Sequence, residues 1–359
     1  MINRKIIYLI TILLGVRLCF SWSAKKPLPK VGYTTLDRLD QQAMPLILSC
    51  SGMTLTEEER SLFQSANPMG FILFNRNIKS KAQTLQLIKE LKNCLQDRSF
   101  FPILIDEEGG RVDRLRQFHA DVEFPPALNF GRAVREGQSI IKIKQAVVEN
   151  AKNIAKLLRS WSFNVNCAPV SDLYDDELGI RGDHTKKNPA IGNRSFSAVV
   201  DVVVNLSDSF IKGQADNGVL SIIKHIPGHG LAVVDSHKEL PVVSNSLEDL
   251  EAHDFKVFKN LAGSGSWGMV SHIVYDALDH AYPASQSAKA IAYIRDRLGF
   301  ENVLLSDAIE MQALKGSMGD RALKSLEAGL DLVIYGAGEI NDMRAMVKTL
   351  TQHGYGAAV

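Results

Sequence analysis

The feature that most constrains the fold of this 359-residue chain is a short apolar, β-rich segment that recurs eight times. Each copy ends abruptly in polar or glycine residues and is followed by a stretch with helical features. The segments lie at residues 45–49, 70–74, 102–106, 163–167, 219–223, 267–271, 302–306 and 331–335. Their nearly continuous hydrophobicity, without strict alternation, is typical of strands covered on both faces, as in a parallel sheet.

Helix signals lie between these segments. Residues 139–159 have apolar side chains at helical spacing, and Thr56 with Glu59 has the pattern of a capping box at the start of another helix. Eight β-then-α units over roughly 300 residues predict an α/β fold, a single (β/α)8 TIM-type barrel with enlarged βα loops. A doubly wound open sheet is the alternative architecture.

Composition limits the partners. The chain has 41 Lys and Arg against 40 Asp and Glu, so it carries no basic footprint for nucleic acid, and we expect a small-molecule ligand. The four cysteines lack metal-ligand spacing and indicate no disulfide framework; they are Cys19, Cys50, Cys94 and Cys167. Cys50 and Cys167 lie in apolar runs typical of buried thiols.

Polar side chains follow four of the eight predicted strands at the point where each ends. Catalytic groups in a (β/α)8 barrel gather at the carboxyl ends of its strands, so these clusters predict an active site there. In chain order the clusters are Asp106 with Arg111 and Arg114, then Lys224 with His225, then His272, then Asp307.

The densest polar cluster runs from Lys224 to His237 and contains three imidazoles among glycines and a proline. Because a buried helix or strand would not satisfy so many polar groups, the segment predicts an active-site loop. Asp235 and His237 are two residues apart, so in an extended conformation the carboxylate orients the ring and favours its protonated form, as a general acid requires. A hydrogen-bonded surface pair is the alternative. His229 is expected to brace the loop rather than touch a ligand.

The remaining candidates each have a structural alternative. Asp307 ends an apolar strand, where a carboxylate nucleophile is expected, but it is also placed to cap a helix at residues 309–314. Asp106 beside an arginine is typical of sugar binding, with a purely structural ion pair as the alternative. Lys224 and His225 are able to donate to ligand oxygens, whereas a solvated strand end is the other interpretation of Lys224. Arg194, in a long polar loop, is uninformative by itself.

With these residues in place, the chain resembles the single-domain β-N-acetylglucosaminidases (β-hexosaminidases) of glycoside hydrolase family 3, the NagZ type. The most specific matching motif is Lys-His-Ile-Pro-Gly-His-Gly at residues 224–230 followed by Asp-Ser-His at 235–237. Other matching pieces lie, in the same order, at residues 70–74, 105–112, 191–196 and 305–307.

The resemblance implies retaining, two-step hydrolysis on a (β/α)8 barrel without a metal or organic cofactor. It implies that Asp307 is the nucleophile and that His237, assisted by Asp235, is the acid/base. It assigns the binding of the N-acetylglucosamine ring to Asp106, Arg114, Arg194, Lys224 and His225. The implied substrate is a small carbohydrate or muropeptide from peptidoglycan. We expect the protein to act as a monomer.

Two departures from the family pattern bear on these assignments. Ala308 stands where a second aspartate often follows the nucleophile. The loop at residues 174–189 is longer and more polar than usual, which leaves the position of Arg194 open.

The first residues form a separate segment. Arg4 and Lys5 precede an apolar run at residues 6–16, a layout that resembles a secretory signal with a poor cleavage site. A translation start assigned too early is the alternative. We therefore expect a signal-like segment and extension at residues 1–40 and a catalytic domain at residues 41–359. A working signal would place the enzyme in the periplasm or anchor it at the inner membrane; otherwise it would be cytoplasmic, as is usual for the family.

Three other functions are alternatives to glycoside hydrolysis. The histidines His225, His229, His237 and His272 with Asp307 suggest a zinc-dependent amidohydrolase, although the first strand lacks the His-x-His that such enzymes usually carry. A β-N-acetylglucosaminide phosphorylase is closer, because an imidazole acid/base does not repel phosphate. A non-catalytic cell-wall binding protein is disfavoured by the complete catalytic set.

Overall fold

The computed structural model describes residues 42–119, 121–236 and 238–356 of the chain. The signal-like segment predicted for residues 1–40 lies outside this part. No helix within the described ranges is both long enough and apolar enough to cross a membrane.

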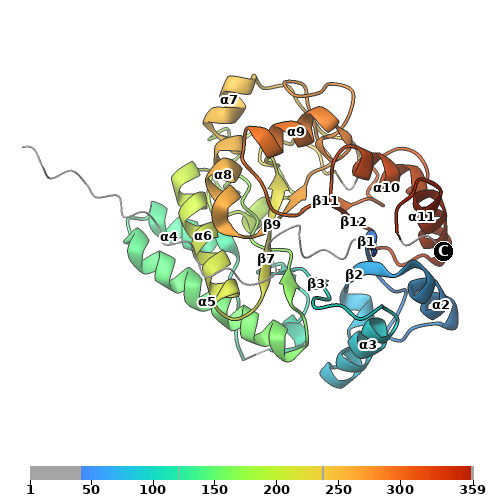
Figure 1. Ribbon diagram of the computed structural model, residues 1–359. Helices are drawn as coiled ribbons and strands as arrows, with labels where there is room; N and C mark the ends of the chain where they lie inside the picture. Colours follow the sequence, from blue (N-terminus) through green and yellow to red (C-terminus); the bar gives the residue numbers. More distant parts are fainter. Residues whose placement is uncertain (1–41, 120, 237, 357–359) are drawn as a thin grey trace, which may run out of the picture. The chain divides into compact units, whose positions relative to one another are not determined.

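The described chain forms a closed eight-stranded barrel in which every neighbouring pair of strands is parallel (Figure 1). The strands are β1 (Met44–Leu48), β2 (Pro68–Ile72), β3 (Ile103–Ile105), β6 (Val165–Asn166), β7 (Leu220–Ile226), β9 (Trp267–Val270), β11 (Leu304–Ala308) and β12 (Leu332–Ile334). β1 closes the ring by pairing with both β2 and β12. Each strand overlaps one of the eight predicted segments. The (β/α)8 prediction is confirmed, and the open-sheet alternative is wrong.

Alternate residues of each strand face opposite sides of the barrel wall, as strand geometry requires. Ile47 belongs to the cluster that fills the barrel interior with Leu104, Ile222, Trp267 and Leu305. The residues between them face outward and pack under the helices in the larger core cluster. The interior is therefore apolar, and the charged side chains are confined to the strand ends.

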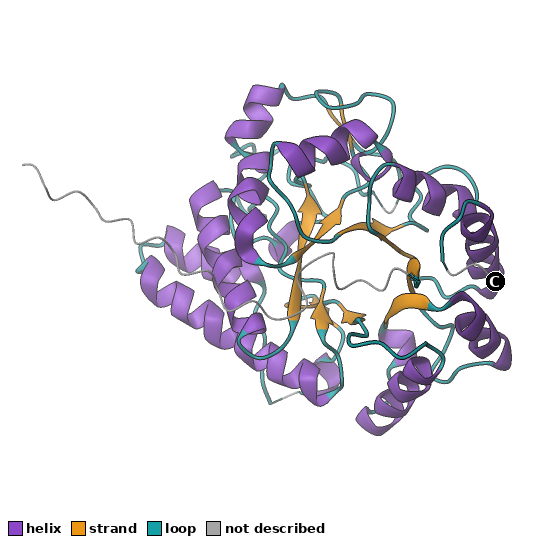
Figure 2. Cartoon of the chain, in the orientation of Figure 1, coloured by secondary structure: helices purple, strands orange, loops and turns teal. Residues whose placement is uncertain are grey.

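Helices surround the strands (Figure 2). They are α2 (Glu57–Ala66), α3 (Lys81–Asn93), α4 (Ala127–Arg135), α5 (Ile140–Ser160), α6 (Val200–Ala215), α7 (Leu247–Ala252), α8 (Asp254–Leu261), α9 (Ala288–Asp296), α10 (Met318–Glu327) and α11 (Ile340–Gln352). The capping box of α2 is confirmed, because the Thr56 hydroxyl accepts from the Glu59 N–H and Glu59 accepts from the Thr56 N–H. The predicted helix at residues 139–159 is α5, displaced by one residue.

The enlarged βα loops carry their own small elements. After β3, strands β4 (Glu107–Gly109) and β5 (Val112–Asp113) form an antiparallel hairpin. Gly109 and Gly110 turn it with φ of +86° and +60°, which is the left-handed region that favours glycine. After β7 and β9, strands β8 (Val242–Val243) and β10 (Val274–Tyr275) pair in parallel. The hairpin and the β7 end form the walls of the site described next.

Candidate active site

One cavity of about 230 Å³ lies at the carboxyl ends of the barrel strands and brings together most of the predicted site residues. Phe74, Glu108 and Met269 are among the other residues that line it. Six predicted residues reach it from four separate strand ends or loops: Asp106, Arg114, Arg194, Lys224, His225 and Asp307. These six predicted residues therefore gather at the end of the barrel where active sites of this fold lie.

Lys224 is the centre of a buried charge network. Its Nζ lies 2.8 Å from Asp106 Oδ1 and 2.7 Å from Glu108 Oε1. The Lys224 side chain is only 3% exposed, so the solvated strand end is ruled out. Burial alone would lower the pKa of Lys224, but the two carboxylates raise it above its usual value, so the amine stays protonated.

Lys224 and His225 lie within β7 rather than in a loop after it, because the strand continues to Ile226. The expectation that a buried strand would not satisfy such residues was wrong. Carboxylates on other strand ends supply the missing partners, and a single sequence segment does not reveal them. The peptide bonds Lys224–His225 and Ile226–Pro227 are both cis.

Glu108 is a site residue that sequence reasoning missed. Its carboxylate accepts two hydrogen bonds from Arg194, at 2.8 and 2.7 Å, and is 5% exposed. Burial alone would raise the pKa of Glu108, but Arg194 and Lys224 lower it far more, so the pKa lies well below its usual value. The missed signal was its spacing of two residues from Asp106, which in an extended segment puts both side chains on one face.

Arg194 takes its place in the cavity despite the long loop that precedes it. Arg111 holds this loop, because its Nη2 donates to the carbonyl oxygens of Pro189, Ala190 and Ile191 at 2.9, 2.7 and 3.0 Å. Arg111 is thus a support for the loop. Its neighbour Arg114 lines the cavity, with Nη2 3.6 Å from Asp106 Oδ2.

His225 is oriented by Asp172, a second residue that the sequence did not single out. The Asp172 carboxylate lies 2.7 Å from His225 Nδ1 and also accepts the backbone N–H groups of His225 and His229, at 3.1 and 2.6 Å. Burial would raise the pKa of Asp172, but His225 and these donors lower it below its usual value. An ionised Asp172 accepts from Nδ1–H and leaves Nε2 as the ring nitrogen for the cavity.

The loop after β7 is anchored at its base. The His229 ring is buried, its Nε2 lies 3.3 Å from Ser236 Oγ, and Asn188 donates to the His229 carbonyl at 2.7 Å. His229 does not line the cavity, in agreement with its expected bracing role. Burial and the neighbouring His225 lower the pKa of His229 to about 4.

The proposed acid/base pair is described only in part. His237 lies outside the described residues, so its position stays a prediction. The Asp235 carbonyl accepts from the N–H groups of Lys238 and Glu239, at 2.8 and 3.1 Å. The Asp235 side chain is not among those that line the cavity.

Asp307 lies near the end of β11 and faces the cavity. Its Oδ1 accepts from the Ala308 N–H at 2.8 Å. Residues 309–314 form turns instead of a helix, so the helix-capping alternative is wrong. The Ala313 N–H donates to the Ser236 carbonyl at 3.3 Å, which joins the chain after Asp307 to the loop after β7.

Two described histidines at this end, His229 and His272, already use ring nitrogens in hydrogen bonds within the protein. His272 Nδ1 lies 2.7 Å from Ser285 Oγ, and its Nε2 lies 3.1 Å from the Ala308 carbonyl oxygen. Burial lowers the pKa of His272, and the contact of its ring with the Ala308 carbonyl supports the end of β11. Together with the Ser236 contact of His229, this arrangement does not favour the amidohydrolase alternative.

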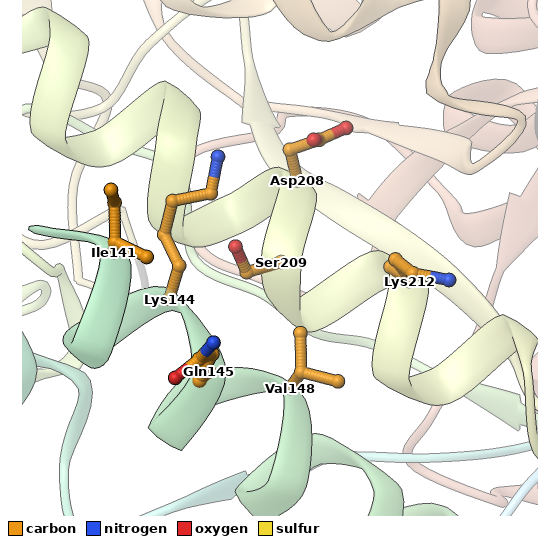
Figure 3. Close-up of a pocket in the computed structure, with 7 residues that line it drawn as sticks. All are labelled: Ile141, Lys144, Gln145, Val148, Asp208, Ser209 and Lys212. Carbon is orange, nitrogen blue, oxygen red and sulfur yellow. The ribbon is translucent and has the colours of Figure 1, made fainter. Parts of the chain in front are cut away.

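A larger cavity, of about 460 Å³, lies between helices α5 and α6 (Figure 3). The two lysines that line it already have partners, because Lys144 donates to Asn205 and Lys212 pairs with Asp216. Both helices belong to the outer layer of the barrel. This cavity lacks the convergent charged groups of the smaller one, which we take as the active site.

Comparison with known proteins identifies the class. The profile described as "Glycosyl hydrolase family 3 N terminal domain" matches residues 35–354. The chain therefore belongs to glycoside hydrolase family 3 and is a glycosidase. The resemblance to NagZ-type β-N-acetylglucosaminidases is confirmed by individual relatives.

Two relatives named beta-hexosaminidase illustrate the similarity. The protein of Shewanella frigidimarina is 32% identical over 317 residues, covering 87% of this chain and 86% of the relative. That of Photobacterium profundum is 33% identical over 297 residues, covering 81% of each chain.

Solved structures agree. NagZ from Neisseria gonorrhoeae in complex with N-trifluoroacetyl-D-glucosamine is 29% identical with a TM-score of 0.74, over 89% of this chain and 87% of that one. A family 3 β-N-acetylglucosaminidase from Paenibacillus is 28% identical with a TM-score of 0.75, over 89% of this chain. The matched region spans 58% of the Paenibacillus protein's length.

Proposed function

We propose that this protein is a retaining exo-β-N-acetylglucosaminidase that removes a terminal β-linked N-acetylglucosamine, with muropeptides from peptidoglycan as its natural substrates. The observation that carries the proposal is the cavity in which Asp307 meets the Asp106–Lys224–Glu108–Arg194 network. At about 230 Å³, this cavity is smaller than the ~300–1,000 Å³ typical of drug-sized ligands. It suits one sugar unit, and therefore exo cleavage.

Asp307 is the proposed nucleophile. Its carboxylate attacks the anomeric carbon and forms a C–O bond as the glycosidic C–O bond breaks, which gives a covalent glycosyl-enzyme. Water then attacks the same carbon and releases Asp307. Two displacements at one carbon leave the sugar in its original β configuration.

His237 is the proposed acid/base, with Asp235 as its partner. It gives a proton to the departing oxygen in the first step and takes one from water in the second. An imidazole in this role avoids a second negative charge next to Asp307. The hydrogen bond between Ser236 and Ala313 supports the assignment, because it holds the neighbouring residue of the loop against the chain that follows Asp307.

The charged network is proposed to hold the sugar ring. Asp106 presents a carboxylate to paired ring hydroxyls, while Arg114, Arg194, Lys224 and His225 supply donors. Glu108 keeps Arg194 and Lys224 in place and charged. Because these groups are already paired before substrate arrives, little reorganisation is needed on binding.

The acetamido group is the second part of the specificity proposal. The ligand in the Neisseria structure is an N-acylated glucosamine, and the relatives above carry the name beta-hexosaminidase. We extend this preference to the present chain, acting as a monomer without a nucleic-acid partner. We propose that residues 1–40 determine where the enzyme acts. N-terminal sequencing of the native protein, together with the cell fraction in which it is found, tests whether this segment is a signal.

Turnover of an aryl β-N-acetylglucosaminide tests the proposal. The unsubstituted enzyme should release free N-acetylglucosamine, and Asp307→Ala should abolish release while retaining the fold by circular dichroism. Full activity in Asp307→Ala would overturn the assignment of the nucleophile. Accumulation of a sugar 1-phosphate in phosphate buffer would replace hydrolysis by phosphorolysis.

A further inference from the structure

A second cluster of ionisable groups lies behind the wall of the active-site cavity. The hairpin β4–β5 presents Glu108 to the cavity, whereas Glu107, the preceding residue on the strand, faces the other way. A carboxylate oxygen of Glu107, one of Asp113 and a ring nitrogen of His119 all lie within 4.8 Å of one another.

The Glu107 side chain is completely buried, and only one of its two carboxylate oxygens accepts hydrogen bonds. Its Oε2 accepts the N–H groups of Arg114 and Leu115, at 3.0 and 3.2 Å, but Oε1 has no hydrogen-bond partner among the described residues. Its neighbour in the cluster is another carboxylate, that of Asp113, whose side chain is 3% exposed. Two buried carboxylates this close repel each other when both are ionised, so a cation held between them and the His119 ring would stabilise the cluster.

His119 completes the cluster with the geometry of a metal ligand. Its Nδ1 lies 2.8 Å from the Val122 carbonyl oxygen, to which it donates, and its Nε2 points at Asp113 Oδ1, 2.9 Å away. A backbone acceptor that fixes one ring nitrogen and aims the other is the usual arrangement around a ligating histidine. The centroid of the His119 ring also lies 4.7 Å from that of the Phe124 ring, and this packing restrains the orientation of His119.

A cavity reaches the edge of the cluster, although Glu107 itself is fully buried and does not line it. Asp113 and His119 line a separate cavity of about 190 Å³, together with Arg116, Val122, Glu123 and Phe124. Arg116 donates to the Gly110 carbonyl at 3.3 Å, so its charge is directed partly away from the carboxylates. The cavity provides an entry path and room for the water ligands that would complete a coordination shell.

We propose that Glu107, Asp113 and His119 bind a divalent transition-metal ion, with Zn²⁺ the best match. One imidazole and two carboxylates are ligands that Zn²⁺ accepts at ~2.0–2.2 Å. The ion cross-links β4, β5 and His119. It thereby braces the hairpin from behind, since Glu107 lies between Asp106 and Glu108 and Asp113 precedes Arg114. The role is structural and independent of the proposed hydrolysis.

Zn²⁺ titration of chelator-treated, full-length protein by isothermal calorimetry tests this site. The unsubstituted protein should bind one Zn²⁺ with a rise in Tm, and the double variant Glu107→Gln/Asp113→Asn should bind it at least ~10-fold more weakly. His237→Ala is the matched control, because it removes an imidazole from the active-site loop and should leave this affinity unchanged.

Two outcomes would overturn the proposal. One is a dissociation constant weaker than ~1 mM for the unsubstituted protein, which would leave a shared proton as the compensating charge. The other is affinity lost in His237→Ala but kept in the double variant, which would assign the ion to the active-site loop. If the double variant does not fold, X-ray absorption of the Zn²⁺-loaded unsubstituted protein decides, since the site predicts one imidazole nitrogen with oxygen ligands and no more than one histidine.

Discussion

Replacing Glu108 by glutamine should destabilise the protein far more than the loss of one surface charge would. Glu108 is buried and neutralises two cations, because Arg194 binds both of its oxygens and Lys224 lies 2.7 Å from one of them. The glutamine side chain keeps one acceptor oxygen but carries no negative charge. Arg194 and Lys224 would then share a single carboxylate of the network, that of Asp106. Breaking a buried ion pair on one side costs ~3–5 kcal/mol. We expect a loss near the lower end, ~3 kcal/mol in the free energy of unfolding.

Glu177→Gln is the matched control. Glu177 also accepts from two arginines, Arg132 and Arg135, but its side chain is 44% exposed. Exposed pairs contribute ~0.2–1 kcal/mol, so this substitution should lower the free energy of unfolding by that amount at most.

Equilibrium urea unfolding of both variants at neutral pH gives the comparison, and turnover of an aryl β-N-acetylglucosaminide gives the effect on the site. Glu108→Gln should also lower kcat/KM by at least ~10-fold, which corresponds to ~1.4 kcal/mol, because Arg194 and Lys224 lose their anchor. Equal unfolding losses in the two variants would refute the argument that burial makes the Glu108 network strong.

Three further outcomes are expected. His237→Ala should slow substrates with poor leaving groups by ~10²–10⁴ and activated ones much less; equal slowing would contradict its role as proton donor. Because the pKa of His229 is lowered to about 4, the unfolded chain binds more protons between pH 6.5 and 4, so stability should fall as the pH drops through this window. When the midpoint of urea unfolding is plotted against pH, His229→Gln should show a weaker dependence between pH 6.5 and 4. An unchanged dependence would mean that another group causes the loss of stability. Arg111→Lys, which loses the planar fork that holds residues 189–191, should raise KM more than it lowers kcat, whereas a pure fall in kcat would refute a loop-positioning role.

The sequence predicts the barrel well because a parallel strand covered on both faces is nearly all apolar. This pattern located all eight strands, including β6, which is only two residues long. It placed the end of β7 too early, at residue 223, because Lys224 and His225 interrupt the apolar run although they continue the strand. Their partners Asp106, Glu108 and Asp172 come from distant parts of the chain, so local hydrophobicity carries no sign of them.

The site is less predictable than the fold for the same reason. Asp106, Arg114, Arg194 and Lys224 lie in polar motifs and share one cavity in the structure. Glu107 and Glu108 are adjacent and chemically alike, yet one joins the site network and the other faces away from it. The side of the hairpin on which each lies depends on where β4 begins.

The most direct test of the central claim is to trap the glycosyl-enzyme with a slow fluorinated N-acetylglucosamine substrate and to map the modified peptide by mass spectrometry. The account predicts one adduct per chain, carried by the carboxylate of Asp307, and none on the Asp307→Ala variant. An adduct on a different side chain, or hydrolysis that proceeds with inversion and without any adduct, would contradict it.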